Sequence, residues 1–361
     1  MTPTRWSAAR IGWIGLAFLV CSVCGAADLE PGLPKNTTAV LTVNLKQMLH
    51  SPLVKHHGLA TLRQACRETE EARAVLQALG VDPLRDLDRL TAASVGHGEK
   101  PSFLFILRGR FDTSRFSTAA KRLAKEFNER FEWKKEGDLK YLYLVETGGH
   151  GSIVLGAGAK AAKGAMLNLQ SNGCLLDLFP KYCLALADKN TLVVASSDEI
   201  LKETCKHLCD PRAASANKTM RRLFAELDGK QSIAFAVCPP PATFETLAVD
   251  EGKDEKLQAK PSLLREMIGG ITVTDDFKLR CTIKATSIED ARKVMDGCEE
   301  VRLRLDGLMT CLAGTSKEYA FLKEIPRSFL AVRKGNVLLI EGRLSTETLN
   351  RLFASCSFIG R

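Results

Sequence analysis

The chain has 361 residues, of which 45% are hydrophobic and 26% charged, and its formal net charge at pH 7 is +9. These values are ordinary for globular proteins and exclude collagen-like, coiled-coil and wholly disordered chains. The length is typical of two domains, each large enough to bury a core without the support of disulfides or metals.

Residues 1–27 have the pattern of a secretory signal peptide. Arg5 and Arg10 come before a mainly apolar run at 11–24, and 25–27 are the small residues Gly, Ala and Ala that suit a cleavage site. A run of about fourteen residues is shorter than the roughly twenty that span a bilayer. We therefore expect cleavage, no membrane span in the mature chain, and a periplasmic or extracellular location.

Two other fates of this segment are open. A lipid could be attached at Cys21 or Cys24, although a valine rather than a small residue precedes each of them. The segment could also stay uncleaved and serve as an anchor. Cleavage removes two arginines and no acidic residue, so it would lower the net charge to +7.

The pattern at 28–210 predicts a first module that mixes strands and helices. Strands are expected at 39–43, 90–95, 103–108, 140–145, 182–187 and 192–195. Helices are expected from about 46, at 59–79, around Phe116 and at 198–207. Asp82 before Pro83 is typical of a capped helix start.

Residues 229–361 repeat this order of elements as a second module. Strands are expected at 232–237, 268–273, 277–284, 329–332 and 337–340, and helices at 287–308 and 345–354. The small and polar residues around 210–218 indicate a linker, which we place at 211–228. The proline-rich and charged stretch at 239–261 is expected to be a second, solvated loop.

The two modules also match residue by residue in places. Residues 187–194 align without a gap on 332–339, and each segment is followed by an expected helix. The offset between the halves varies, which an insertion at 148–180 explains. We therefore predict an α+β fold of two tandem, duplicated modules, each a mostly antiparallel sheet covered by helices on one face.

Several strand and turn signatures carry a resemblance to a group of proteins. They are Ala39 to Asn44, Leu49-His50-Ser51-Pro52-Leu53, Leu79-Gly80-Val81-Asp82-Pro83, Leu87-Asp88-Arg89-Leu90 and Leu107-Arg108-Gly109-Arg110-Phe111-Asp112. In these segments the mature chain resembles uncharacterised exported proteins of planctomycete-type bacteria. The resemblance implies an envelope location and no known activity, and the stretch 148–180 departs from it.

The cysteines favour buried thiols over a disulfide framework. Ten of the twelve remain after cleavage, and five lie at apolar positions of expected helices or strands. These five are Cys66, Cys205, Cys281, Cys298 and Cys356. One or two bridges that involve Cys174, Cys183 or Cys311 remain an alternative.

Basic and aromatic residues alternate between 108 and 140, which could suit a nucleic-acid groove. However, Phe116, Ala120 and Phe127 are spaced as one buried face of a helix, so the basic residues fall on its solvated side. We therefore expect no nucleic-acid partner.

The histidines do not form a convincing metal site. Neighbours such as His56 and His57 point about 100° apart on a helix, so they cannot share an ion, and His50 has no second ligand nearby. Cys205, His207 and Cys209 supply three soft donors, but Cys205 belongs to an apolar face and His207 is expected to point away from it. No metal site is assigned.

Candidate nucleophiles and acids are equally weak. Ser215 and Lys218 match Ser-x-x-Lys, but the partner motifs of that chemistry are absent and the match lies in the expected linker. The acidic residues Asp82, Asp86 and Asp88, and the pair Asp275-Asp276, fit turns and caps, where such side chains bond nearby backbone.

A glycine-rich stretch at 148–164 could present amides together with Lys160 and Lys163 to an anion. It satisfies neither the P-loop nor the dinucleotide pattern, and a flexible insertion explains it. No catalytic residue and no cofactor are assigned.

The sequence thus favours an exported cell-envelope protein that binds or supports an envelope protein or polymer without catalysis. The alternative is a secreted hydrolase whose catalytic residues are not grouped in sequence. A pocket in which a nucleophile and a base converge would favour the hydrolase.

Export predicts a processed N-terminus. Intact-mass and N-terminal analysis of the protein from its native cells should give a chain that begins near Ala27 or Asp28. Recovery of a soluble cytoplasmic form that still begins at Met1 would contradict the prediction.

Overall fold

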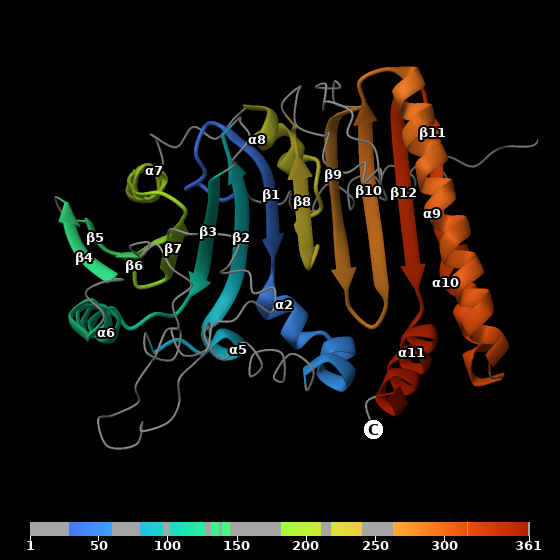
Figure 1. Ribbon diagram of the computed structural model, residues 1–361, viewed down its shortest axis with the longest axis horizontal. Coiled ribbons are helices and arrows are strands. Elements are labelled where there is room, and N and C mark those ends of the chain that lie inside the picture. The colour runs from blue at the N-terminus through green and yellow to red at the C-terminus, as the bar shows by residue number, and fades with distance from the viewer. Residues whose placement is uncertain are drawn as a thin grey trace, which may run out of the picture.

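A computed structural model of the chain describes residues 29–59, 80–96, 102–126, 131–136, 139–144, 182–210, 218–239, 263–315 and 317–359. The described strands form one continuous antiparallel sheet in the order β11-β12-β10-β9-β8-β1-β2-β3-β7-β6-β5-β4 (Figure 1). The strands are β1 (Thr37–Val43), β2 (Leu87–Val95), β3 (Ser102–Gly109), β4 (Phe131–Glu136), β5 (Leu139–Leu144), β6 (Tyr182–Asp188), β7 (Thr191–Ala195), β8 (Ile233–Val237), β9 (Leu264–Val273), β10 (Phe277–Ala285), β11 (Phe329–Lys334) and β12 (Val337–Leu344).

Helices connect the strands and pack on the sheet. They are α2 (Leu45–His50), the π-helical turn η1 (Val54–Gly58), α5 (Pro83–Asp86), α6 (Thr113–Glu126), α7 (Asp198–Cys209), α8 (Lys218–Ala225), α9 (Ile288–Thr315), the 3₁₀ helix η4 (Lys317–Lys323), α10 (Glu324–Arg327) and α11 (Thr346–Ile359). The α+β class predicted from the sequence is confirmed.

The two halves of the chain meet at the centre of the sheet. β1 pairs antiparallel with β8, from Ala39 opposite Val237 to Val43 opposite Ile233. Outward from this junction, the first half runs β1-β2-β3-β7-β6 and the second half runs β8-β9-β10-β12-β11. Each outward series therefore visits its strands in the same order, and β5 and β4 extend the first half alone.

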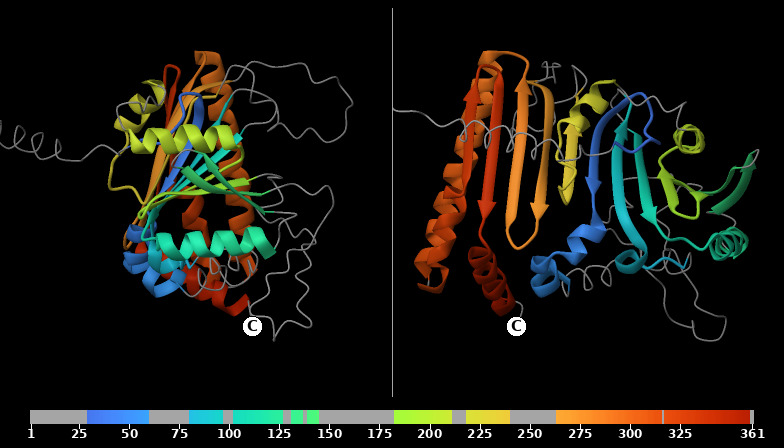
Figure 2. Two further views of the ribbon diagram at one scale, coloured as in Figure 1. Left: turned by 90° about the vertical axis from the view of Figure 1, so that its left-hand side faces the viewer. Right: turned by 180° about the vertical axis from the view of Figure 1, so that it is seen from behind.

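Helices lie on both faces of the sheet, so the predicted covering of one face alone is wrong for the first half and holds for β10, β12 and β11. We call one side the α7 face, because α7 and α8 pack there on residues such as Val40 and Ile106. The other side is the α9 face, where α6 packs on Leu192 and α9 packs on Ile283. Figure 2 (left panel) looks along the sheet, with α8 on one side and α9 on the other. The alternation of a strand supplies apolar side chains to both faces.

The α7 face is covered unevenly, and the burial of two matched strands shows it. In β7, Leu192 and Val193 are both buried, because helices lie over both sides of this strand. In β12, Leu338 is buried beneath α9 while Val337 and Leu339 are half-buried. Both strands lead into helices, as predicted, but no described helix covers the α7 face of β10, β12 and β11.

Local signals explain where the main helices begin. The Ser197 side chain accepts a hydrogen bond from the Ile200 amide at the start of α7. Ser287 and Asp290 form a reciprocal cap before α9, in which the Asp290 amide donates to Ser287 Oγ at 3.0 Å. Cap residues of this kind contribute about 1 kcal/mol each.

Two expectations about the second half need correction. The range 211–228, expected to be a linker, contains the helix α8, because Met220, Leu223 and Phe224 are spaced to bury one side against the sheet. In α9, Ile288 and Val301 have the spacing of a buried helical face, which would place them in the core, but they are 60% and 66% exposed. β4 was not predicted from the sequence, because four of its six residues are charged.

Some expectations lie outside the described residues. They are the signal peptide at 1–27, most of the helix at 59–79, the glycine-rich stretch 148–164 with Lys160 and Lys163, the loop at 239–261 beyond its first residue, Ser215, and Cys66, Cys174 and the side chain of Cys356. Among the described helices, none is long and apolar enough to cross a membrane.

The described cysteines are all free thiols. Cys183, Cys205 and Cys281 are buried and Cys298 is half-buried, as small apolar side chains would be. Neither Cys183 nor Cys311 forms a bridge, so the alternative of disulfides at these two positions is not supported.

Val193 and Val332, which both lie on the α7 face of the sheet, give a direct test of the uneven covering. Val193 is fully buried in β7, whereas Val332 in β11 is 48% exposed. Val193→Asp should lower the free energy of unfolding by more than about 4 kcal/mol, because it buries a charge without a partner. Val332→Asp should cost about 1 kcal/mol or less. Urea denaturation of both variants checks this, and equal losses would contradict the description of the two faces.

Candidate functional site

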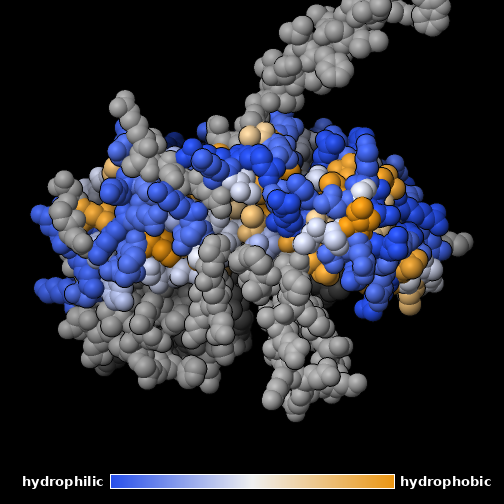
Figure 3. Space-filling model, turned by 90° about the horizontal axis from the view of Figure 1, so that it is seen from above, coloured by the Kyte–Doolittle hydropathy of each residue, from blue (hydrophilic) through white to orange (hydrophobic). Residues whose placement is uncertain are grey.

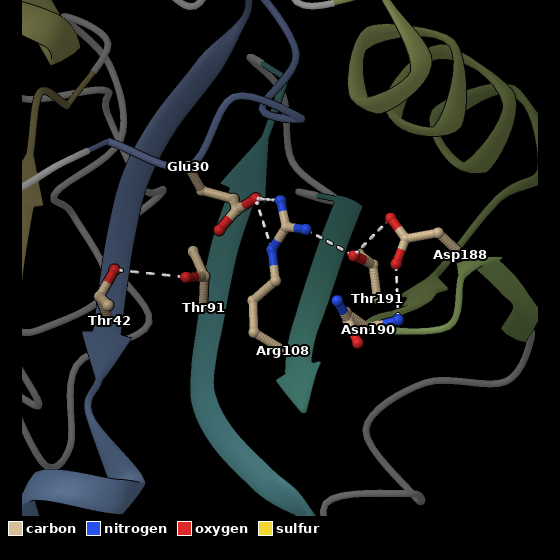
Figure 4. Close-up of polar contacts among 7 residues, drawn as sticks. All are labelled: Glu30, Thr42, Thr91, Arg108, Asp188, Asn190 and Thr191. Carbon is tan, nitrogen blue, oxygen red and sulfur yellow. Dashed lines mark hydrogen bonds and ion pairs between the residues drawn. The ribbon is translucent and has the colours of Figure 1, made fainter. Parts of the chain in front are cut away.

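A chain of polar contacts crosses the α7 face at the ends of β3 and β7 (Figure 4). The Arg108 guanidinium donates from Nε to Glu30 Oε1 at 3.1 Å and also from Nη2 to the same oxygen. Its Nη1 donates to Thr191 Oγ1, and Thr191 Oγ1 in turn donates to Asp188 Oδ2 at 3.0 Å. This chain fixes Arg108 from both sides.

Burial makes the ion pair of this chain important for stability. The Glu30 side chain is 4% exposed and the Arg108 side chain 30% exposed. A carboxylate this far from water costs free energy unless a cation and hydrogen bonds compensate it. Arg108 supplies both, so the segment that precedes β1 is attached to β3 by a charged contact.

A second arginine lies directly across from the first. The register of β2 on β3 places Arg89 opposite Arg108, so both side chains belong to the α7 face. Like charges at directly opposite positions of neighbouring strands destabilise a sheet. Glu30 compensates Arg108, but half-buried Arg89 makes no hydrogen bond or ion pair within the described part of the chain.

A cavity of about 500 Å³ opens at these two arginines. Lys46 of α2 and Asp88 of β2 also line it, and they form an exposed ion pair at 3.6 Å. The cavity wall thus carries three cations and, with Glu30, two carboxylates. Both carboxylates already have a cationic partner, so the unpaired charge of the cavity is the guanidinium of Arg89.

The Asn44 side chain caps α2, the helix that carries Lys46, and both residues line this cavity. Asn44 Oδ1 accepts from the Gln47 amide at 3.0 Å, and Asn44 Nδ2 donates to Gln47 Oε1. The cavity is therefore built by the ends of β1, β2 and β3 and the first turn of α2.

A larger cavity of about 640 Å³ lies between α6 and α7, where the pairing of β5 with β6 ends. Its polar groups include Lys140, Lys202 and the thiols of Cys205 and Cys209. Burial raises the pKa of the Cys205 thiol to about 12, so this thiol is protonated at neutral pH and is a poor nucleophile. No carboxylate or imidazole among the described residues lines this cavity beside the thiols.

The structure separates the histidines considered as metal ligands. His50 Nδ1 contacts the Lys46 carbonyl oxygen, and His56 Nδ1 contacts the Pro52 carbonyl oxygen. His57 Nε2 instead lies 2.7 Å from Asn350 Oδ1 of α11. The ring nitrogens of the neighbouring pair therefore have different partners, and the described residues hold no cluster of three metal-ligating side chains.

The Cys205, His207 and Cys209 set does not converge either. Cys205 is buried in the core and Cys209 is exposed. His207, expected to point away from the core, is buried, and its Nδ1 has no hydrogen-bond partner within the described residues. We assign it no role.

The acidic residues act mainly as predicted for turns and caps. Asp82 Oδ1 accepts from the Leu84 amide and begins α5, while Asp86 pairs with Arg85. Asp276 differs from the expectation, because it binds side chains rather than its own backbone: the Thr274 hydroxyl at 2.9 Å and Arg343 at 2.9 Å. Lys218, which was considered as part of a Ser-x-x-Lys match and not assigned a catalytic role, is an exposed residue at the start of α8.

Arg89, Arg108 and Glu30 were not predicted as a site from the sequence. One signal was present, because Arg108 follows Leu104 and Ile106 at the alternate positions that face the core. A charged residue at the end of such a series needs a partner. The partner itself could not be found from local pattern, since Glu30 lies 78 residues away.

Comparisons with known proteins do not identify the chain. No family model matches it, and no curated protein matches it. Solved structures that resemble it include two crystal forms, I and III, of the spirochete protein TP0453. They are 10% and 8% identical, cover 91% of this chain and 98% and 99% of theirs, and have TM-scores of 0.43 and 0.44. No property of that protein is carried over to this chain.

The buried ion pair predicts an unequal effect of two Glu to Gln changes. Glu30→Gln should lower the free energy of unfolding by about 1–3 kcal/mol, because it leaves Arg108 without a counter-charge. Glu300→Gln, in an exposed pair with Arg304 on α9, should change it by about 0.5 kcal/mol or less. Chemical denaturation measures both, and a Glu30→Gln protein as stable as the control would show that the contact is not stabilising.

Proposed function

We propose that the protein is an exported cell-envelope protein that binds an anionic group, a carboxylate or a phosphate, in the cavity at Arg89. The unpaired guanidinium carries this proposal. Arg89 lies opposite Arg108 on the same face of the sheet and makes no contact with a described carboxylate. An anion between the two strands would remove a repulsion that the protein alone leaves uncompensated.

The neighbouring groups favour binding over catalysis. The cavity offers guanidinium and ammonium donors, which hold an oxyanion well. Its two carboxylates are engaged by Arg108 and Lys46. We therefore infer a non-catalytic binding protein, and export rests on the pattern of residues 1–27. The carboxylate or phosphate would belong to a component of the envelope, either a protein or a polymer.

We also infer that the two halves arose by duplication. The equal strand order outward from β1 and from β8 supports this, together with the match of 187–194 to 332–339. In that case the cavity at Arg89 is a specialisation of the first half. In the second half, β9 and β10 take the places that β2 and β3 take in the first half, and they also pair antiparallel. No two arginines lie opposite each other in that pairing.

Calorimetric titration of the mature chain with inorganic phosphate and with succinate tests the binding proposal. We expect binding of at least one of the two anions, weaker at high ionic strength because the cavity is open to solvent. Arg89→Gln should raise its Kd at least about tenfold, since a hydrogen bond to a charged group contributes roughly 1.5–3 kcal/mol. Comparison of the two anions distinguishes a phosphate from a carboxylate ligand.

The matched control is Arg292→Gln, which removes the same charge from the exposed surface of α9. It should leave the Kd unchanged. Equal affinities of the Arg89→Gln and Arg292→Gln proteins would show that the net charge, not the cavity, attracts the anion. Failure of the native protein to bind either anion would also refute the proposal.

A further inference from the structure

The outer side of β11 has no partner among the described strands. β11 ends the sheet and pairs through Ala331 opposite Ile340 with β12 alone. The Arg343 amide donates to the Ser328 carbonyl oxygen at 3.2 Å. Because antiparallel pairs alternate, the amide and carbonyl groups of Phe329, Ala331 and Arg333 are directed away from β12. They form a row of donors and acceptors on which another strand can pair.

β11 also exposes apolar side chains, as a strand that pairs with a further strand would. Leu330 and Val332 are 60% and 48% exposed, and the register with β12 places both on the α7 face. Of the nine large apolar side chains that the described structure leaves exposed, these two lie on β11 and five on α9. Figure 3 shows apolar patches among hydrophilic surface at this end of the molecule.

The lysines near β11 limit which side chains a neighbouring strand can carry. On the α7 face, Lys284 of β10, Val337 of β12 and Lys334 of β11 form one row across the sheet. Neither lysine of this row makes an ion pair within the described part of the chain. The strand β11 itself contains Arg333 and Lys334 and no acidic residue. A neighbouring strand therefore needs an acidic side chain opposite Lys334.

A second copy of the chain does not meet this need. β11 contains no acidic residue, so a second β11 strand in any register would leave Lys334 without an acidic side chain opposite it. The other edge strand, β4, has Glu132 and Lys134 at its central positions on this face. Pairing with it would place a charged side chain against Leu330 or Val332.

We propose that β11 is a docking edge for an extended segment of another protein, which adds to the sheet as a further antiparallel strand. The segment has an acidic residue opposite Lys334 and apolar residues opposite Val332 and Leu330. Read along the partner, this is an acidic residue followed by apolar residues at every second position. The backbone of β11 supplies affinity, and the side chains on the α7 face supply specificity.

The probe is a fluorescein-labelled ten-residue peptide in which threonine alternates with one glutamate, one valine and one isoleucine in that order. Its binding to the mature chain is measured by fluorescence anisotropy. Amide hydrogen exchange should show new protection at Phe329, Ala331 and Arg333. A control peptide with lysine in place of glutamate should bind at least about tenfold more weakly, because it places like charges opposite each other.

Three protein variants locate the contact. Ala331→Pro removes an outward amide that makes no bond to β12, and Lys334→Gln removes the charge that the acidic residue would meet. Each should raise the Kd of the peptide at least about fivefold, which is about 1 kcal/mol. Lys135→Gln, on the exposed surface of the other edge strand β4, is the matched control and should have no effect.

Three results would overturn the proposal. They are the absence of binding at millimolar peptide, equal binding of the glutamate and lysine peptides, and protection elsewhere than on β11. If Ala331→Pro does not fold, the Lys334→Gln variant and the exchange pattern decide the question. Neither readout depends on anion binding at Arg89, so each proposal can fail without the other.

Discussion

The antiparallel pairing of β1 with β8 is the contact on which the rest of the structure depends. These strands come from opposite halves of the chain, and their five opposed residue pairs join two groups of strands into one sheet. Without this pairing, each group would end in a strand with unpaired amide and carbonyl groups. The side chains that the junction buries, such as Val40 and Ala236, also belong to the largest apolar cluster. The junction therefore couples the cores of both halves.

The way in which helices cover this single sheet also determines where binding sites can lie. On the α7 face, α8 packs on β8 and α7 packs on β5, β6 and β7. Polar side chains on this face must therefore be compensated or reached by a ligand. This explains why Glu30 binds Arg108 and why the unpaired Arg89 beside them indicates a binding site. At the far end of the second half, no described helix covers the α7 face, and the edge of β11 stays accessible. The uneven covering of one sheet therefore accounts for both proposed binding surfaces, the cavity at Arg89 and the edge of β11.

Local pattern was sufficient to predict most of the strands and helices. The continuous apolar run in β3, the apolar alternation in β10 and the caps at Ser197 and Ser287 are all short-range signals, and each is present in the folded protein. The helix α8 carried a signal too, since Met220, Leu223 and Phe224 have helical spacing, but the polar residues before it favoured a linker. β4 was missed because four of its six residues are charged and its apolar alternation is limited to Phe131 and Trp133.

The continuity of the sheet and the candidate site could not be predicted, because both depend on contacts between distant residues. Ala39 and Val237 are about two hundred positions apart, and no periodicity shows that they pair. Taken separately, Arg89 and Arg108 are ordinary charged residues near the ends of two strands. Their significance comes from the register of β2 on β3 and from the partner that Arg108 alone obtains.

Native-state hydrogen exchange of the mature chain tests the central junction most directly. If the twelve strands form one cooperative sheet, the bonded amides of β1 and β8 should exchange only through global unfolding, with the same free energy in both halves. Denaturant should then remove the structure of both halves in a single transition. Fast exchange at 233–237, or separate transitions for 29–210 and 218–359, would contradict the account and indicate two modules that fold independently.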